Sequence, residues 1–268
     1  MLARVEGEGA LELSIRQGRI DDLKLRIFEP PRLFEKFLEG RGNQEVPDMV
    51  ARICGICPVA YQMSAVHAIE SVFGADAGPW VRDMRRLFYC GEWIQSHSLH
   101  IHLLAVACFL GFENAVVMSR EHADVLRRGL GLQALGNDII RLLGGRSVHP
   151  VGARVGGFWQ APALDDLAEM YARLSAALPE AEALVRWTGA LNLPADDQAF
   201  TSVALRHAHE YPLNTGRITA SNGLDIAIEE FEQHFVEHQV AHSTALHALL
   251  DGKPYLVGPL ARVNLNID

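Results

Sequence analysis

The sequence has little of what several classes of protein require. Its 24 Lys and Arg residues are outnumbered by 33 Asp and Glu residues, which gives a formal net charge of −9. Binding to nucleic acid needs clustered cations that displace counterions from phosphates, so this balance argues against nucleic acid as a partner. The most apolar stretch, 103–112, is about half as long as the roughly 20 residues that cross a bilayer, so we expect no membrane span.

Export signals, repeats and low-complexity tracts are also absent from the sequence. Its first residues, MLARVEGEG, lack the apolar segment of a secretory signal. Because 49% of the residues are hydrophobic and 21% are charged, the chain can bury a sizeable core and is not a disordered segment. We therefore expect a folded, acidic, cytoplasmic protein.

Cysteine is scarce as well, and two of the four cysteines form a C-x-x-C pair. In a cytoplasmic protein this spacing indicates redox or metal chemistry before it indicates a structural disulfide. Cys54 and Cys57 are spaced so that both sulfurs can bind one metal ion. Pro58 follows and favours the first position of a helix, whose dipole and free N–H groups stabilise thiolate, the form that binds metal.

The other two cysteines, Cys90 and Cys108, do not complete a four-thiolate site. Both fall in a stretch with helical periodicity, and 18 positions of continuous helix would separate them by about 27 Å. At most one of them could approach the C-x-x-C pair. We interpret both as buried structural thiols.

Apolar spacing predicts a mainly α-helical protein with a small N-terminal β-hairpin. Residues 10–15 and 20–28 alternate in polarity around a turn at 17–19, and a short helix is expected between Pro30 and Gly40. Helical periodicity then predicts five longer helices, at 58–73, 79–110, 121–143, 163–189 and 224–250.

Two further segments are predicted as loops. The glycine-rich segment 143–157 has the composition of a loop that packs closely against its surroundings, and 258–264 is expected to form a terminal loop. The predicted organisation is an N-terminal β element at 1–30 and a helical catalytic domain at 31–268.

The C-x-x-C pair lies in RICGICPVAY, 52–61, which resembles the first metal-binding motif of nickel–iron hydrogenase large subunits. Other motifs of that family occur in the family's order along the chain. They are R-V-E-G at 4–7, R-L-F-E at 32–35, S-H-S-L-H at 96–100, G-G-R-S-V-H-P with a second G-G at 144–157, and G-P-L-A-R at 258–262. RICGICPVAYQMSA and VHPVGARVGG are most similar to the cytoplasmic NAD(P)-linked and sulfhydrogenase-type members.

The resemblance implies the helical core of a hydrogenase large subunit that catalyses reversible heterolytic oxidation of H₂. It makes Cys54 a terminal nickel ligand and Cys57 a bridge from nickel to an iron carrying CO and cyanide, metals that soft thiolates suit. It assigns to Glu6 the relay that carries the proton away, since the pKa of a carboxylate can be tuned by burial. Electrons would pass to an iron–sulfur small subunit, because this chain has too few cysteines for its own clusters. NAD(P)-reductase subunits are further candidate partners.

The resemblance also assigns supporting residues. Glu35 falls where the family has a carboxylate that ligates a structural magnesium ion; an exposed helix charge is the alternative, and Glu29 competes for the role. His149 resembles a histidine between the metal centre and the nearest cluster of the small subunit, with a core histidine bonded to backbone as the alternative. Arg52 belongs to the cysteine motif. Tyr61 stands where many members have a histidine that hydrogen-bonds the bridging thiolate, and a phenol can still donate that bond.

The family's second cysteine motif, D-P-C-x-x-C, does not occur in this sequence. A nickel–iron site needs four thiolates, and the matching motif supplies two. The resemblance therefore implies the N-terminal part of a longer subunit, without its C-terminal part. We expect the chain by itself to hold no nickel–iron cluster and to be inactive, with 52–61 loosely ordered or closed by zinc or a Cys54–Cys57 disulfide.

Two functions of other classes fit parts of the same pattern. The quinone-pocket subunit of respiratory complex I shares the expected fold and serves structure and proton coupling, but it has lost the nickel ligands that RICGIC retains. A zinc-binding interaction module would need the C-x-x-C pair alone. Metal analysis separates the three functions, as nickel with iron, no metal, or zinc.

The histidines outside these motifs do not indicate a second enzyme. His234, His238 and His242 fall on one face of the predicted helix 224–250, and the last two have the spacing of a zinc protease. Gln239 replaces the catalytic Glu of H-E-x-x-H, so the general base is missing. We interpret this row as a polar helix stripe. His97 and His100 are interpreted as residues that pack at a subunit surface.

Overall fold

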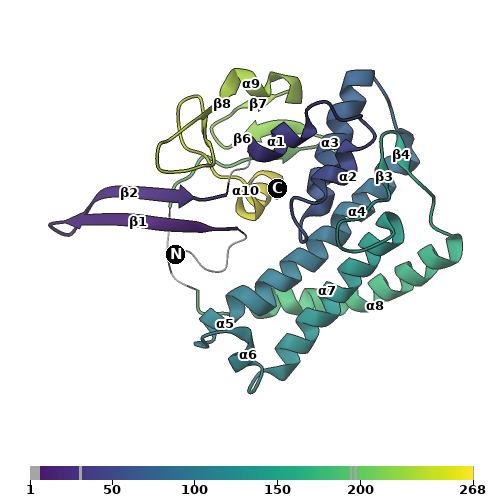
Figure 1. Ribbon diagram of the computed structural model, residues 1–268. Helices are drawn as coiled ribbons and strands as arrows, with labels where there is room; N and C mark the ends of the chain where they lie inside the picture. Colours follow the sequence, from purple (N-terminus) through teal and green to yellow (C-terminus); the bar gives the residue numbers. More distant parts are fainter. Residues whose placement is uncertain (1–6, 30–31, 194, 196–197, 268) are drawn as a thin grey trace. The chain divides into compact units, whose positions relative to one another are not determined.

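The computed structural model describes residues 7–29, 32–193, 195 and 198–267. The chain folds into two compact units. Phe37–Ala195 forms one, here called the helical unit, and Met1–Lys36 with Asp196–Asp268 forms the other, called the mixed unit. The ribbon in Figure 1 shows long helices in the helical unit and short strands and helices in the mixed unit. The predicted class, mainly α with an N-terminal β-hairpin, is confirmed.

The helical unit is built on four long helices and several short elements. Among its described residues these are α2 (Val46–Val50), α3 (Pro58–Phe73), α4 (Gly78–Leu99), a π-helix (His100–Ala105), α5 (Val106–Phe109), α6 (Ala115–Met118), α7 (Ala123–Gly144), the hairpin of β3 (Ala153–Arg154) and β4 (Gly157–Phe158), and α8 (Leu164–Gly189). The predictions for α3, α7 and α8 are correct to within two residues at each end. Helix α1 (Arg32–Leu38) spans the boundary of the two units.

The local chemistry of the sequence explains where the helices of this unit end. Pro58 occupies the first position of α3, where its missing N–H costs no hydrogen bond. Gly74 closes α3 and Gly145 closes α7 with left-handed φ angles of 62° and 78°, which glycine adopts without strain. The predicted short helix likewise ends before Gly40, whose φ is 76°.

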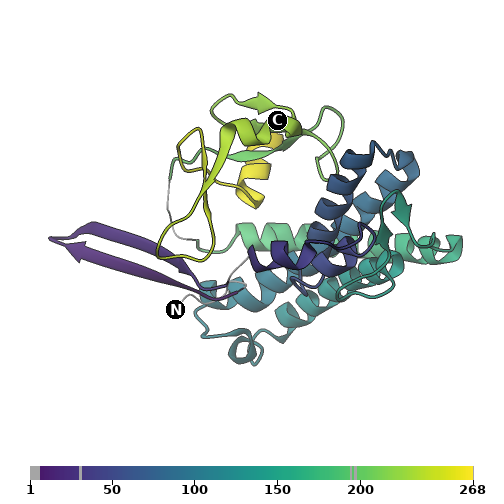
Figure 2. The same ribbon diagram turned by 45° about the horizontal axis from the view of Figure 1, so that its top comes forward.

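Helices α4 and α7 lie side by side in both Figure 1 and Figure 2. They approach closely because glycines face each other: a methyl group on Gly136 would lie 2.6 Å from the carbonyl oxygen of Gly91. Around this contact α3, α4, α7 and β3 bury a common apolar cluster. Its buried members are Val59, Met63, Val66, Phe88, Ile140, Leu143 and Ala153.

The predicted helix 79–110 is interrupted by the π-helix, which the apolar pattern did not indicate. His102, within the π-helix, is completely buried and its Nδ1 donates to the Ser98 carbonyl oxygen at 2.9 Å. Its Nε2 accepts from Arg128 Nε at 3.3 Å. Burial lowers the pKa of His102, so the ring is neutral and bridges α4 to α7.

The prediction that Cys90 and Cys108 are buried is wrong for Cys108. Cys108 lies in the single turn of α5 and is exposed, whereas Cys90 in α4 is half-buried. Position 108 falls beyond the π-helix, which changes the face that the following residues present. The helical phase extrapolated from 79–99 therefore fails there.

In the mixed unit, β1 (Gly9–Arg16) and β2 (Arg19–Ile27) form the predicted antiparallel hairpin. Gln17 and Gly18 make its two-residue turn, both with positive φ, as twisted hairpins require. The described remainder of this unit contains further strands and short helices. These are β5 (Val203–Arg206), β6 (Arg217–Ala220), β7 (Asp225–Ile226), a 3₁₀ turn (Ile228–Glu230), α9 (Phe231–His234), β8 (Phe235–His238), β9 (His247–Leu250) and α10 (Pro259–Asn266).

The predicted helix 224–250 is wrong, because this segment forms β7, α9, β8 and β9. The apolar residues that gave it helical periodicity, among them Ile226, Phe235 and Leu250, enter one buried cluster. That cluster also contains residues of β5 and β6, and β5–β6–β7 form one antiparallel sheet. Pairing of β7 with β6 and of β8 with β9, together with packing against β5 and β6, therefore overrides the local pattern. The predicted terminal loop is wrong as well, because Pro259 begins α10.

The polar helix stripe of histidines is consequently not formed. His234 ends α9 and pairs with Asp251 at 3.2 Å, while His238 ends β8 and His242 lies in the following loop. The imidazole rings of His238 and His242 each lie 5.7 Å, between centroids, from that of His247.

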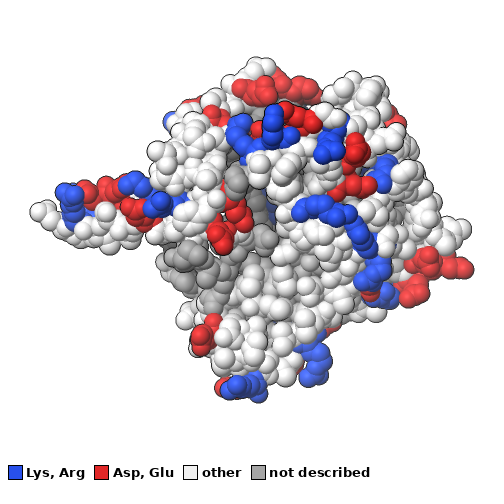
Figure 3. Space-filling model, in the orientation of Figure 1, with Lys and Arg blue, Asp and Glu red and all other residues white. Residues whose placement is uncertain are grey.

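The structure also shows how charge and apolar residues are distributed. Figure 3 shows residues of both signs interspersed over the face in view, so the negative charge is not gathered into one acidic patch on that face. Among the residues that the structure describes, no helix has the length and apolarity needed to span a bilayer.

Candidate metal centre

The C-x-x-C pair forms a tight turn between α2 and α3 in the helical unit. Cys54 is buried, Cys57 is half-buried, and neither forms a disulfide. Their sulfur atoms lie 2.6 Å apart. The backbone nitrogens of Ile56 and Cys57 donate to Cys54 Sγ at 3.3 and 3.2 Å. Two sulfurs directed at one point, one of them accepting two N–H groups, form an arrangement suited to a soft metal ion.

His149 lies beside this turn, as the resemblance implies. Its Nδ1 donates to the carbonyl oxygen of Ala51 at 2.7 Å, which fixes the tautomer with Nε2 unprotonated in the neutral ring. The backbone of His149 has a φ of 49°, unusual for a residue with a side chain. A Cβ on Gly55 would lie 3.9 Å from His149 Cε1, an ordinary van der Waals distance, so the imidazole lies directly beside the cysteine turn.

His149 therefore makes the backbone hydrogen bond that was the alternative interpretation of this residue, and it makes that bond while lying beside the cysteine turn. Gln62 of α3 binds the loop that contains His149, because its Nε2 donates to the Pro150 carbonyl oxygen at 2.6 Å. The segment around His149 and Pro150 is thus tied to both ends of the cysteine motif. This explains the high glycine content of 143–157: a methyl group on Gly152 would lie 2.1 Å from the Leu143 carbonyl oxygen.

Arg52 and Tyr61 flank the cysteines on the chain. Arg52 is exposed, and its backbone nitrogen donates to Met49 at the end of α2. Tyr61 lies in the first turn of α3 with 38% of its surface exposed. Their roles toward the thiols stay predictions.

The two predicted carboxylates, Glu6 and Glu35, belong to the mixed unit, whereas the cysteine turn belongs to the helical unit. Glu6 lies outside the described residues. Glu35 lies in α1, is largely exposed, and accepts from Arg32 Nη1 at 3.2 Å. Arg32 also pairs with Glu237 of β8 at 3.6 Å. The magnesium role of Glu35 stays a prediction. In the structure its side chain is an exposed charge on a helix, paired with Arg32.

Two polar residues of α4, which sequence reasoning missed, contact the cysteine turn. Glu92 is 4% exposed and accepts hydrogen bonds from the backbone nitrogens of Val59 and Ala60. Gln95 is equally buried and its Nε2 donates to the Ile56 carbonyl oxygen. Burial raises the pKa of Glu92 to about 7, against the two backbone hydrogen bonds that lower it. No sequence signal marks them, because a Glu and a Gln three positions apart on a helix ordinarily face solvent.

Cys54 and Cys57 suit a soft metal ion, but two thiols make up only part of the ligand set that such an ion needs. Among the described residues, no group of three or more His, Cys, Asp or Glu side chains is arranged to hold a metal ion. The thiols and their N–H donors match the chemistry of nickel or iron, and the remaining ligands of such a centre are not found in the described structure.

Comparison with known proteins points to one family. Residues 32–128 match the family described as nickel-dependent hydrogenase. The chain is 34% identical over 263 residues to the sulfhydrogenase 2 subunit alpha of Pyrococcus furiosus, which covers 98% of this chain and 61% of that protein. Identity to the sulfhydrogenase 1 subunit alpha of the same organism is 32% over 269 residues, covering 100% and 63%.

A solved structure shows the same relationship. The crystal structure of an NAD⁺-reducing [NiFe]-hydrogenase in the H₂-reduced state matches with a TM-score of 0.83 and 27% identity, covering 100% of this chain and 65% of that one. The chain thus spans less than two thirds of the length of these relatives.

The fold and the cysteine turn define the large-subunit class of hydrogenases. Over residues 32–128 by the family model, and over nearly its whole length by its relatives, the chain is similar to the nickel-dependent hydrogenase family. Within the family it is similar to sulfhydrogenase-type and NAD⁺-reducing members, so the resemblance predicted from its motifs is confirmed.

Proposed function

We propose that this chain supplies two thiolate ligands, Cys54 and Cys57, to the nickel–iron centre of a hydrogenase large subunit. The observation that carries the proposal is the convergence of the two sulfurs at the N-terminus of α3, within a fold that hydrogenase large subunits share. Cys54 would bind nickel alone, and Cys57 would bridge nickel to an iron carrying CO and cyanide. When bound, such a centre supplies the reversible heterolytic oxidation of H₂.

The chain's own residues would orient the ligands and move the proton. The two backbone N–H groups that donate to Cys54 Sγ would hold this sulfur in place. His149, Arg52 and Tyr61 would support the ligands around the turn. The Glu6 carboxylate would accept the proton that leaves the centre and pass it outward. Glu35 would hold a magnesium ion at α1.

We further propose that electrons pass to an iron–sulfur small subunit and from there to NAD(P)-reductase subunits in the cytoplasm. Support comes from relatives that are named alpha subunits of sulfhydrogenases and from the NAD⁺-reducing hydrogenase of the same fold. The acceptor is proposed from these relatives because the sequence contains no G-x-G-x-x-G nucleotide motif of its own.

Nickel titration of the full chain tests the ligand assignment. We expect sulfur-to-nickel charge-transfer absorption that disappears in Cys54→Ser and Cys57→Ser. The matched control Cys90→Ser should keep it, because Cys90 lies in α4 outside the turn. Equal absorption in Cys57→Ser would overturn the proposal.

The proton relay is tested in the enzyme assembled with its metal centre and partner subunits. Glu6→Gln keeps the size of the side chain but cannot carry a proton. We expect H₂ turnover to fall by about 100-fold or more while the nickel content is unchanged. Unchanged turnover would remove Glu6 from the mechanism.

A further inference from the structure

The first turn of α3 is capped by a side chain from another helix. The N-cap residue of α3 is Cys57, whose side chain makes no capping hydrogen bond. Glu92 of α4 takes this role, with Oε2 accepting from Val59 N at 2.6 Å and Oε1 accepting from Ala60 N at 3.2 Å. A helix leaves its first N–H groups without partners, so this contact satisfies donors that the cysteine leaves free.

The carboxylate occupies an unusual place for a charged group. Glu92 is 4% exposed, and no ion pair to it occurs among the described residues. Burying a carboxyl group without a cation is costly, so the contact with α3 must compensate by hydrogen bonds alone. A buried leucine would fill the same space without that cost, but it could not accept from α3.

The same face of α4 also holds the other side of Cys57. Gln95, three positions after Glu92, donates to the carbonyl oxygen of Ile56. The peptide group that precedes Cys57 and the two peptide groups that follow Pro58 are therefore all fastened to α4. Because Cys54 Sγ accepts from the nitrogens of Ile56 and Cys57, the position of this backbone also fixes the first sulfur.

We propose that Glu92 is a positioning residue for the cysteine pair: by capping α3 it fixes the backbone of Cys57 and keeps the two sulfur atoms directed at one point. The relevance of that geometry to metal binding rests on the proposed function. The geometry itself, however, can be measured without a metal, because sulfurs held together form a disulfide more readily than sulfurs on a loose turn.

The experiment measures the thiol–disulfide equilibrium of Cys54 and Cys57 with glutathione at one fixed pH, in full chains that carry Cys90→Ser and Cys108→Ser. Each disulfide formed consumes one oxidised glutathione and releases two reduced ones. The equilibrium constant thus gives the effective concentration of one thiol at the other. Glu92→Leu removes the acceptor, whereas Glu92→Gln retains an amide oxygen that can accept from both N–H groups.

We expect the effective concentration to fall by about 10-fold or more in Glu92→Leu and to stay within about 3-fold of the parent in Glu92→Gln. Met118→Ala is the control for general destabilisation, because Met118 is fully buried in a separate apolar cluster of the same unit. It should lower the melting temperature and leave the equilibrium within about 3-fold. If Glu92→Leu does not fold, Gln95→Leu applies the same test from the other side of Cys57.

An unchanged equilibrium in Glu92→Leu, or an equal fall in Met118→Ala, would overturn the positioning role. Nickel titration of the same variants keeps this result separate from the proposed function. If the parent chain binds no nickel, the result contradicts only the proposal that Cys54 and Cys57 are nickel ligands. A Cys57-dependent nickel signal that is equal in parent and Glu92→Leu would contradict the positioning role alone.

Discussion

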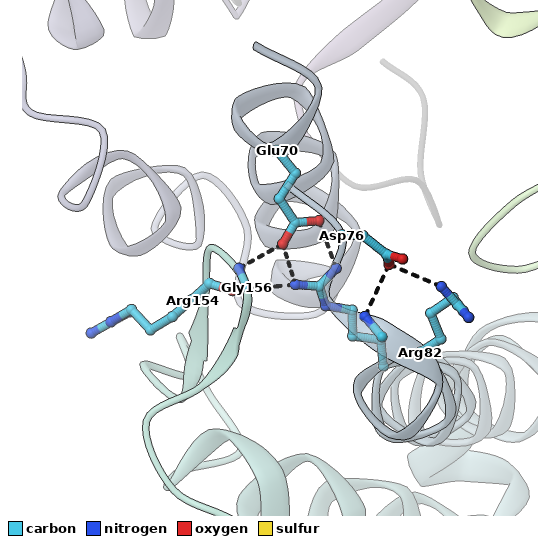
Figure 4. A network of polar contacts seen from close by, with 7 residues as sticks. Glu70, Asp76, Arg82, Arg154 and Gly156 are labelled. Carbon is cyan, nitrogen blue, oxygen red and sulfur yellow. Dashed lines mark hydrogen bonds and ion pairs between the residues drawn. The ribbon is translucent and has the colours of Figure 1, made fainter. Parts of the chain in front are cut away.

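Arg85 and Glu70 form a two-pronged ion pair inside the helical unit. Arg85 Nη2 lies 2.6 Å from Glu70 Oε1 and Nη1 lies 2.8 Å from Oε2, with side-chain exposures of 3% and 9%. The Gly156 nitrogen also donates to Glu70 Oε1 at 2.7 Å, and Arg85 reaches the Arg154 carbonyl oxygen at 3.3 Å (Figure 4). Burial would raise the pKa of Glu70, but Arg85 and Gly156 outweigh it and the pKa is lowered. The pair therefore fastens α3, α4 and the β3–β4 hairpin together.

Removal of either partner should leave an uncompensated buried charge. We expect Arg85→Met and Glu70→Leu each to lower the free energy of unfolding by about 3–5 kcal/mol in urea denaturation. The double variant should lose less than the sum of the two single losses, because it leaves no unpaired charge. Strictly additive losses would contradict an energetic coupling of the pair. Arg173→Met, which removes a partly exposed pair with Asp138, should cost less than about 1 kcal/mol.

The close approach of α4 and α7 depends on Gly136. A methyl group there would lie 2.5 Å from the Gln95 nitrogen and 2.6 Å from the Gly91 carbonyl oxygen, both backbone atoms that cannot rotate away. Gly136→Ala should therefore lower the free energy of unfolding by about 2 kcal/mol or more. Gly131, also in α7, has open space around it, so Gly131→Ala should raise the free energy of unfolding by about 0.5–1 kcal/mol. Thermal or urea unfolding of the two variants compares them, and equal effects would contradict the contact.

His149 combines a strained backbone with one directed hydrogen bond. His149→Ala removes the donor to the Ala51 carbonyl oxygen and keeps the side-chain carbon that disfavours a φ of 49°, so we expect faster amide hydrogen exchange across 51–57. His149→Asn should disturb exchange less, because asparagine tolerates positive φ and its amide can donate. Exchange in α8 serves as the internal reference. Exchange across 51–57 that is unchanged in His149→Ala would show that the hydrogen bond does not hold the turn.

The sequence predicts well those elements whose signals are local. Helix α3 is found between its proline and its glycine, and the hairpin β1–β2 at its Gln-Gly turn, because these residues act through their own backbone angles. The segment 224–250 fails for the opposite reason. Its strands have two to four residues each, too few for a period to show, and β7 takes its partner, β6, from outside the segment.

The same distinction applies to the candidate site. Cys54, Cys57 and His149 could be named because they stand in motifs. Glu92 and Gln95 could not, because Glu and Gln on a helix ordinarily face solvent. Their partners, the peptide groups of Ile56, Val59 and Ala60, lie more than thirty positions away. Backbone groups leave no mark in the amino-acid pattern, so only the packing of α4 on the turn reveals the contact.

The buried carboxyl of Glu92 should make stability depend on pH. Its pKa is raised from an ordinary 4.5 to about 7 in the folded protein. A group whose folded pKa is raised contributes stability that is fully present below its unfolded pKa and is lost as pH rises through the folded one. The contribution of Glu92 should therefore decline between about pH 4.5 and pH 7, by about 3 kcal/mol. Glu92→Gln, which is neutral at every pH, lacks this term, so the variant should become more stable relative to the parent by that amount as pH rises. Urea denaturation of both proteins across pH 4.5–8 measures the difference, and a difference that is constant over this range would show that the pKa of Glu92 is the same in the folded and unfolded states.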